Sequence, residues 1–302
     1  MSSIWSHIDL SPDSMLSARS HAYLARSKQA LLDIHITVPD IGTSTSRQTY
    51  CYNDSSIILP LLAIAAPRTK HFTIEANRRQ PDLNFIGLVA ATLFENCIPN
   101  ILREVAISTS RIMYLEQHPL LRDHIRSGRL TALLFPITVL RLELCQLDLA
   151  SDAYHSLTEL RLIDCDMPNS FELTSIFRLS PQLRIFEITS FKEDVPDSSP
   201  LTPVCLENLE VLVLGSFYYE ELDSVLQLIE PSPKPLSLSI MYCISGWQFE
   251  SFVACSNVTR LSTRGFETYS QLAEVISLMP SIRVLAVYEF GDHMTEDVSE
   301  VT

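Results

Sequence analysis

Histidine and acidic side chains cluster most densely in the segment HPLLRDH, where they could bind a metal ion or exchange protons. In this segment His124 follows His118 by six residues, and Asp123 stands directly before His124. On a helix that spacing places the two imidazoles about 120° away from a shared face. Metal ligands must converge on one point, so we interpret the cluster as a solvated helix end. We predict no metal site in this chain.

The seven cysteines could bind a metal or act as nucleophiles, but they include no C-x-x-C pair. Cys145, Cys165 and Cys243 each follow a strand-forming leucine by five residues, at the turn that leaves the strand. A small polarisable side chain fits inside such a turn, and its thiol can contact a backbone carbonyl. We therefore expect free, buried thiols. Because free thiols persist in a reducing compartment, we also expect an intracellular protein, cytoplasmic or nuclear.

The seven glycines lie too far apart for a dinucleotide-binding loop, a P-loop or the elbow of a hydrolase nucleophile. No H-E-x-x-H pair occurs among the eight histidines. With no catalytic motif, we predict a protein that is not an enzyme, has no catalytic residues and needs no cofactor. A cysteine–histidine pair that meets only in the folded chain is the enzymatic alternative left open by the sequence.

Charge is distributed unevenly in this chain of net charge −14. Residues 1–150 carry 14 basic and 13 acidic side chains, whereas residues 151–302 carry 8 basic and 23 acidic ones. An acidic half repels phosphate, so we expect neither nucleic acid nor a membrane as partner, and a basic protein surface is favoured. The alternative is that the acidic residues only keep a leucine-rich chain soluble.

Internal repeats organise the chain. The segments 137–147 (ITVLRLELCQL) and 157–167 (LTELRLIDCDM) both fit the pattern L-x-x-L-x-L-x-x-C-x-L, and looser copies recur on both sides. In each copy, alternation sends two apolar side chains to one face of a short strand. The first inward positions are 34, 72, 105, 140, 160, 186, 212, 238, 261 and 285.

Such strands bury their apolar face by stacking into a parallel sheet, and parallel strands need crossover connections. Segments with helical spacing supply these crossovers, at 15–31, 82–97, 171–179, 219–229, 246–255 and 269–279. The sequence therefore predicts an α/β leucine-rich repeat solenoid, with about ten parallel strands on the concave face and helices on the convex face.

Three regions follow from this repeat pattern. The repeat domain spans residues 13–290, with irregular long repeats at 13–130 and regular repeats at 131–290. Residues 1–12 precede it, and the acidic segment 291–302 follows it as a tail.

Function must come from the side chains that project outward between the buried positions. Charged residues occupy the middle of this surface, and larger apolar residues lie further along the chain. Arginine, methionine and tyrosine are enriched at the centres of protein interfaces. We predict that a protein partner, with basic residues, contacts mainly the strands from 186 to 288. The alternative is a solvated ladder of salt bridges. The candidate partner-binding residues are Arg141, Glu143, Arg161, Glu187, Val213, Met241, Arg264 and Tyr288.

Three segments carry a resemblance to a known family: SIWSHIDLSP (3–12), LARSKQALLDIHITV (24–38) and ILPLLAIAAPRTKHFTIE (58–75). Together they resemble fungal F-box proteins with a leucine-rich repeat region. In that family a phrase like the first segment closes the F-box, and phrases like the other two open the repeats. The resemblance implies that residues 1–12 are the end of an F-box, and that the repeats bind substrates for a ubiquitin ligase.

The chain departs from the family where the body of the F-box should stand. That body, with its early L-P-x-E pattern, should precede Trp5, and the sequence contains no such pattern. We therefore expect no docking to a Skp-type adaptor. The alternative function is a leucine-rich repeat scaffold or decoy without a connection to a ligase.

Overall fold

The computed structural model describes most of the chain. The described residues are 6–10, 14–38, 47–76, 81–115, 118–119, 121–122, 129–146, 154–165, 168–191, 202–215, 217, 219–241, 247–264 and 269–288. They belong to two compact units, Met1–Leu157 (unit 1) and Thr158–Thr302 (unit 2), and each unit is described by itself.

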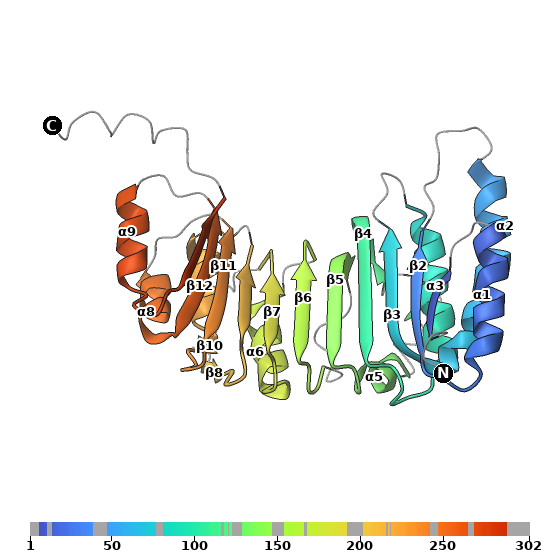
Figure 1. The fold of residues 1–302 in the computed structure, drawn as a ribbon, viewed down its shortest axis with the longest axis horizontal. Coiled ribbons are helices and arrows are strands. Elements are labelled where there is room, and N and C mark those ends of the chain that lie inside the picture. The colour runs from blue at the N-terminus through green and yellow to red at the C-terminus, as the bar shows by residue number, and fades with distance from the viewer. Residues whose placement is uncertain are drawn as a thin grey trace. The chain divides into compact units, whose positions relative to one another are not determined.

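Unit 1 alternates strands and helices, as the repeat pattern predicts. Its elements are β1 (His7–Leu10), α1 (Ser14–Ser27), β2 (Leu32–Thr37), α2 (Arg47–Ala65), the 3-10 turn η2 (Ala66–Arg68), β3 (Thr69–Ala76), α3 (Leu83–Asn96), β4 (Glu104–Tyr114), α5 (Arg129–Leu134) and β5 (Val139–Gln146). The strands pair in parallel in chain order from β1 to β5. Helix α2 packs against both α1 and α3, and the three helices lie beside these strands (Figure 1).

The register of unit 1 confirms the predicted inward positions. Consecutive strand partners are Ile8, Ile34, Phe72, Val105 and Leu140. None of these side chains is more than 2% exposed. Leucine-sized side chains stacked at the spacing of parallel strands, about 4.8 Å, therefore form a continuous apolar core.

The first strand, β1, is a finding that the sequence patterns do not predict. Its backbone pairs with β2, and its alternate residues Ile8 and Leu10 are buried at 1% and 3% exposure. The hydroxyl of Ser20 in α1 donates a hydrogen bond of 2.7 Å to the carbonyl of Asp9. Residues 7–10 are thus a strand of the repeat sheet, fixed to the first helix.

Unit 2 repeats the same construction. Its elements are β6 (Glu159–Ile163), α6 (Ser170–Leu179), β7 (Ile185–Ile188), β8 (Val204–Cys205), β9 (Val211–Leu214), α7 (Tyr219–Leu226), β10 (Ile229–Glu230), β11 (Leu236–Met241), α8 (Trp247–Cys255), β12 (Val258–Arg264), α9 (Tyr269–Ser277) and β13 (Val284–Val287). The main sheet has the order β6-β7-β9-β11-β12-β13, and β8 pairs with β10 in a separate two-stranded sheet.

All six inward positions predicted for unit 2 are register partners. They are Leu160, Phe186, Leu212, Leu238, Leu261 and Leu285. The first five are at most 1% exposed, while Leu285 on the last paired strand keeps 40% of its exposure. The fold is a leucine-rich repeat solenoid of α/β type.

Helix ends follow local chemistry. Asp82 caps α3, because its carboxylate accepts a hydrogen bond of 3.0 Å from the amide of Phe85. The helix predicted over 15–31 ends earlier, at Ser27, because Lys28 has a φ of 51°. The helix predicted over 219–229 also ends earlier, because Ile229 pairs with Val204 of β8. No helix among the described residues combines the length and apolarity of a membrane-crossing segment.

Candidate protein-binding surface

Each sheet has an open face, formed by the side chains that alternate with the buried ones. On unit 2, one row of register partners crosses this face from β6 to β13. We call it the unit 2 row, and its members are Arg161, Glu187, Val213, Ser239, Ser262 and Ala286. The row changes from charged side chains at β6 and β7 to small and apolar ones at β9 to β13.

The charged end of the unit 2 row is an ion-pair triad. The Arg161 guanidinium lies 2.6 Å from a Glu159 carboxylate oxygen and 2.7 Å from one of Glu187. The two carboxylate side chains are only 10% and 15% exposed. Burial lowers the pKa of Arg161, but hydrogen bonds and charge from both carboxylates outweigh it and raise the pKa above its ordinary value. Arg161 and Glu187 are therefore held by each other, and Arg161 compensates two largely buried charges.

The other end of the row opens into a hollow. Met241 ends β11, Arg264 ends β12, and Tyr288 directly follows β13. These three predicted residues line a hollow of about 470 Å³, together with Ser239 and Ser262. Met241 and Tyr288 keep 41% and 71% of their exposure. The structure thus brings three of the predicted residues together around apolar, aromatic and hydroxyl groups.

Val213 lies between these two ends. It is half-buried, and its register partners are Glu187 on β7 and Ser239 on β11. It links the ion-pair triad to the hollow without a charge of its own.

The two remaining predicted residues, Arg141 and Glu143, lie on β5 of unit 1. Arg141 pairs with Glu104 at 2.5 Å, and Glu143 accepts a hydrogen bond from the hydroxyl of Ser108. Both therefore have partners on β4, within their own unit.

In the ion-pair triad and around the hollow, the described charged side chains are two acidic ones, Glu159 and Glu187, and two basic ones, Arg161 and Arg264, so positive and negative charges are equal in number. Glu250 on α8 and Glu274 on α9 are exposed on the helices. Another acidic residue, Glu210, directly precedes β9 and pairs with Arg184 at 2.7 Å. The acidic excess of residues 151–302 is thus not concentrated on this row.

The predicted set of partner-binding residues omits the outward residue that precedes each first inward position. Asp33, His71 and Glu104 occupy this place on unit 1, and Glu159 occupies it on unit 2. Strict alternation along the strand is the signal that finds them, because residues two positions apart share a face.

The described part of the chain contains no cluster of side chains suited to a metal ion. No group of three or more histidine, cysteine or acidic side chains there could hold a metal ion. His118 packs against Gly87 of α3, where a Cβ atom would lie 2.2 Å from the imidazole ring. Burial lowers the pKa of His118. Asp123 and His124 lie outside the described residues.

Five described cysteines are free thiols, and two of them, Cys205 and Cys255, are exposed, contrary to the expectation of buried thiols. Cys145 and Cys165 are buried as predicted, and the thiol of Cys165 contacts the carbonyl of Ile163 at 3.5 Å. Cys97 makes the same kind of contact with Ala66 at 3.4 Å. Cys243 lies outside the described residues. Cys145 and Cys165 therefore serve the packing of their strand ends.

Comparison with known proteins finds a likeness to solved structures but not to a known family. No protein-family model matches the chain, and no curated protein matches it. The chain is similar to the leucine-rich repeat ectodomain of the plant membrane receptor kinase GASSHO1/SCHENGEN3 from Arabidopsis thaliana, solved in complex with CASPARIAN STRIP INTEGRITY FACTOR 2. The identity is 12% and the TM-score 0.30, over 89% of this chain and 37% of that one. The chain thus spans just over a third of the length of that ectodomain. The fold assignment rests on the strand register described above.

Proposed function

We propose that this chain is a non-enzymatic protein-recognition module that binds its partner through the open face of unit 2. The observation that carries the proposal is the unit 2 row, which ends at a hollow flanked by exposed Met241 and Tyr288. Solenoids present extended surfaces of this kind to protein ligands. A rigid sheet holds its side chains in place, so little conformational freedom is lost on binding.

The hollow offers the partner an anchoring point. Met241 and Tyr288 supply apolar and aromatic area, which contributes most to the centre of protein interfaces. Arg264 supplies a guanidinium, and Ser239 and Ser262 supply hydroxyl groups for orienting hydrogen bonds. A partner side chain with an apolar body and a polar end fits this combination.

Replacing both anchors tests the proposal. Affinity capture followed by mass spectrometry identifies the partner, and titration then gives its Kd. We expect Met241→Ala with Tyr288→Ala to weaken binding by about tenfold or more, corresponding to about 1.4 kcal/mol. The lost apolar contact area is the physical reason.

A matched control removes two apolar side chains of helices that are at least as exposed as Met241 and Tyr288. Phe171 on α6 is 71% exposed, as Tyr288 is, and Ile64 on α2 is 61% exposed. Phe171→Ala with Ile64→Ala should leave the Kd unchanged. Capture that survives the hollow variant but fails on replacement of Arg141 and Arg161, with both variants shown by thermal melts to be folded, would assign the binding surface to the charged residues rather than to the hollow.

The finer role we propose is that of the substrate-binding repeat part of an F-box-type ubiquitin-ligase adaptor. The resemblance of residues 3–12, 24–38 and 58–75 to fungal F-box proteins supports it. The alternative is a repeat scaffold or decoy without a ligase. It is favoured by β1, because residues that the resemblance assigns to the end of an F-box form a strand of the repeat sheet. An in-frame L-P-x-E segment in the coding region upstream of Met1 would favour the ligase role over the scaffold.

Docking to a Skp-type adaptor gives a second test. We expect the chain not to co-elute with a purified Skp-type adaptor at micromolar concentration, because it contains no L-P-x-E pattern. Size-exclusion chromatography of the mixture measures this. Stable co-elution would contradict the expectation, and a variant of the first helix, α1, would then show whether that helix is the docking element.

We also propose that the protein works inside the cell, in the cytoplasm or the nucleus, and that its partner carries basic residues. The free thiols of the described residues support an intracellular site. The 23 acidic residues against 8 basic ones in residues 151–302 lie mostly outside the unit 2 row, and they support a basic partner by attracting it to unit 2 at long range. Association driven by such charges should weaken as salt rises.

A further inference from the structure

Unit 1 carries a second distinctive open face, on strands β1 to β5. At its register positions stand three histidines, His7, His35 and His71. Among them stand five carboxylates, Asp9, Asp33, Glu75, Glu104 and Glu143, and one guanidinium, Arg141. We call these nine residues the histidine–carboxylate face.

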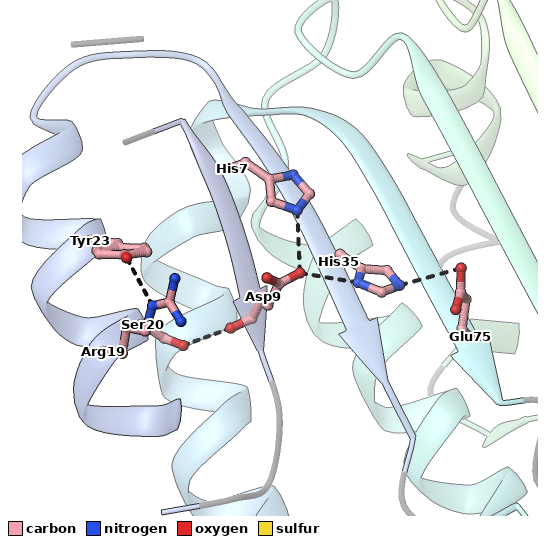
Figure 2. Close-up of polar contacts among 7 residues, drawn as sticks. All are labelled: His7, Asp9, Arg19, Ser20, Tyr23, His35 and Glu75. Carbon is pink, nitrogen blue, oxygen red and sulfur yellow. Dashed lines mark hydrogen bonds and ion pairs between the residues drawn. The ribbon is translucent and has the colours of Figure 1, made fainter. Parts of the chain in front are cut away.

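His35 is the centre of this face. Its Nδ1 lies 3.1 Å from a carboxylate oxygen of Asp9 on β1, and its Nε2 lies 3.4 Å from one of Glu75 on β3. His7 approaches the same oxygen of Asp9 at 3.2 Å, so one carboxylate lies between two imidazoles (Figure 2). His71 pairs with Asp33 at 2.7 Å. Each imidazole of the face therefore has a carboxylate within reach.

The register sets the spacing of these groups. His7, Asp33, His71 and Glu104 are consecutive partners on four neighbouring strands, so imidazole and carboxylate alternate. Carboxylates two strands apart recur at about 10 Å, twice the strand spacing. The bond from Ser20 to the carbonyl of Asp9 fixes β1 against α1 and keeps the first strand in register. The array is thus held by the backbone.

The charge of this face depends on the histidines. With neutral imidazoles, five carboxylates face one guanidinium, which gives a net charge of −4. With three imidazolium ions the net charge is −1. Lys70 and Arg111 are further cations on these strands, and they lie in the register shifts of β3 and β4, outside the paired rows. Histidine is the side chain whose charge ordinarily changes between about pH 5 and pH 8.

The chemistry of the face favours a cationic ligand of extended shape. Three of its five carboxylates are accessible, with Asp9 61%, Glu75 49% and Asp33 40% exposed, while Glu104 and Glu143 have partners on neighbouring strands. Val139 and Tyr114 are the large apolar or aromatic side chains at the outward paired positions, and Tyr114 stands at the end of β4, so charged and polar groups make up most of the face. No metal-binding group occurs among the described residues. Lysine and arginine side chains match carboxylates that repeat across strands.

We propose that the histidine–carboxylate face binds a lysine- or arginine-rich extended segment of a partner protein, and that protonation of its histidines weakens this binding. Neutral imidazoles leave the carboxylates available to incoming cations. Imidazolium ions neutralise Asp9, Asp33 and Glu75 from within the face and compete with the partner. This surface lies on unit 1 and does not depend on the hollow of unit 2.

Fluorescence anisotropy with a labelled peptide tests the proposal on the full chain. The probe is an acetylated and amidated peptide of about ten residues with alternating lysine and threonine, whose charge is constant between about pH 5.5 and pH 8. We expect its Kd to rise by about tenfold or more as the pH falls from about 8 to about 5.5. A Kd independent of pH would overturn the proposal.

Two pairs of variants assign the effect to this face. Replacing His7, His35 and His71 by Gln should reduce the pH-dependent change in Kd to less than about threefold, whereas His21→Gln with His155→Gln should keep it.

Asp33→Asn with Glu75→Gln should weaken binding at about pH 8 by about tenfold. Glu250→Gln with Glu274→Gln on the helices of unit 2 makes the same change in net charge and should have little effect. Equal losses in both carboxylate pairs would mean attraction by net charge alone and would overturn the proposal. Thermal melts confirm that each variant is folded.

Discussion

Leu160→Ala should lower the free energy of unfolding by about 2–5 kcal/mol. Leu160 is fully buried, and its register partner Phe186 is fully buried as well. Truncation removes apolar burial and leaves a cavity, because the stacked backbone of neighbouring repeats cannot collapse into the space. Urea denaturation followed by circular dichroism measures the change.

Leu285→Ala is the matched control at the same repeat position. The side chain of Leu285 keeps 40% of its exposure on β13, so the same truncation removes less buried area. We expect a loss clearly smaller than that for Leu160→Ala. A loss under about 1 kcal/mol for Leu160→Ala would mean that the inward register of unit 2 is wrong.

Arg161→Met should lower the free energy of unfolding by about 2–4 kcal/mol, although Arg161 was selected from the sequence as a binding residue. The substitution keeps most of the side-chain stem but removes the guanidinium. Glu159 and Glu187 then remain as largely buried carboxylates without their cation. We expect the loss of unfolding free energy to be smaller than for a fully buried ion pair, because the Arg161 side chain is 34% exposed. Denaturation in urea again measures it.

Arg184→Met is the matched control for an arginine with a carboxylate partner. Arg184 and Glu210 form an ion pair in which the two side chains are 58% and 48% exposed. Solvent screens such a pair, so its loss should leave the urea denaturation curve unchanged. If Arg161→Met also left the unfolding free energy unchanged, the triad would contribute no more to stability than an exposed ion pair. Arg161 would then remain a candidate for contact with a partner.

The repeat period determines the strands and their buried faces from sequence alone. The L-x-L alternation predicts the inward residues from Ile34 to Leu285, because only one face of each strand can be covered by crossover helices. Cap chemistry likewise predicts the start of α3 at Asp82. These features depend on neighbours in the chain, so local patterns suffice.

Two features could be seen only in the tertiary structure: the first strand, β1, and the end of α7 before the strand β10. His7–Leu10 is too short to show a period, and it is a strand because β2 offers it a backbone edge. Ile229 continues the apolar spacing of α7 but pairs with Val204, which lies 25 residues earlier in the chain. Pairing partners at such separations leave no local signal.

For the candidate surfaces, too, the sequence determined some features and the tertiary structure determined others. The sequence identified Arg161, Met241 and Tyr288 as outward residues from alternation alone. Only the register across strands decided that Arg161 is held between two carboxylates, whereas Met241 and Tyr288 open onto a hollow. The same holds for His35, whose contacts come from strands 26 and 40 residues away in the sequence, at positions 9 and 75. Alternation determines which face a side chain occupies, and the stacking of strands determines its neighbours, because those neighbours are contributed by other repeats.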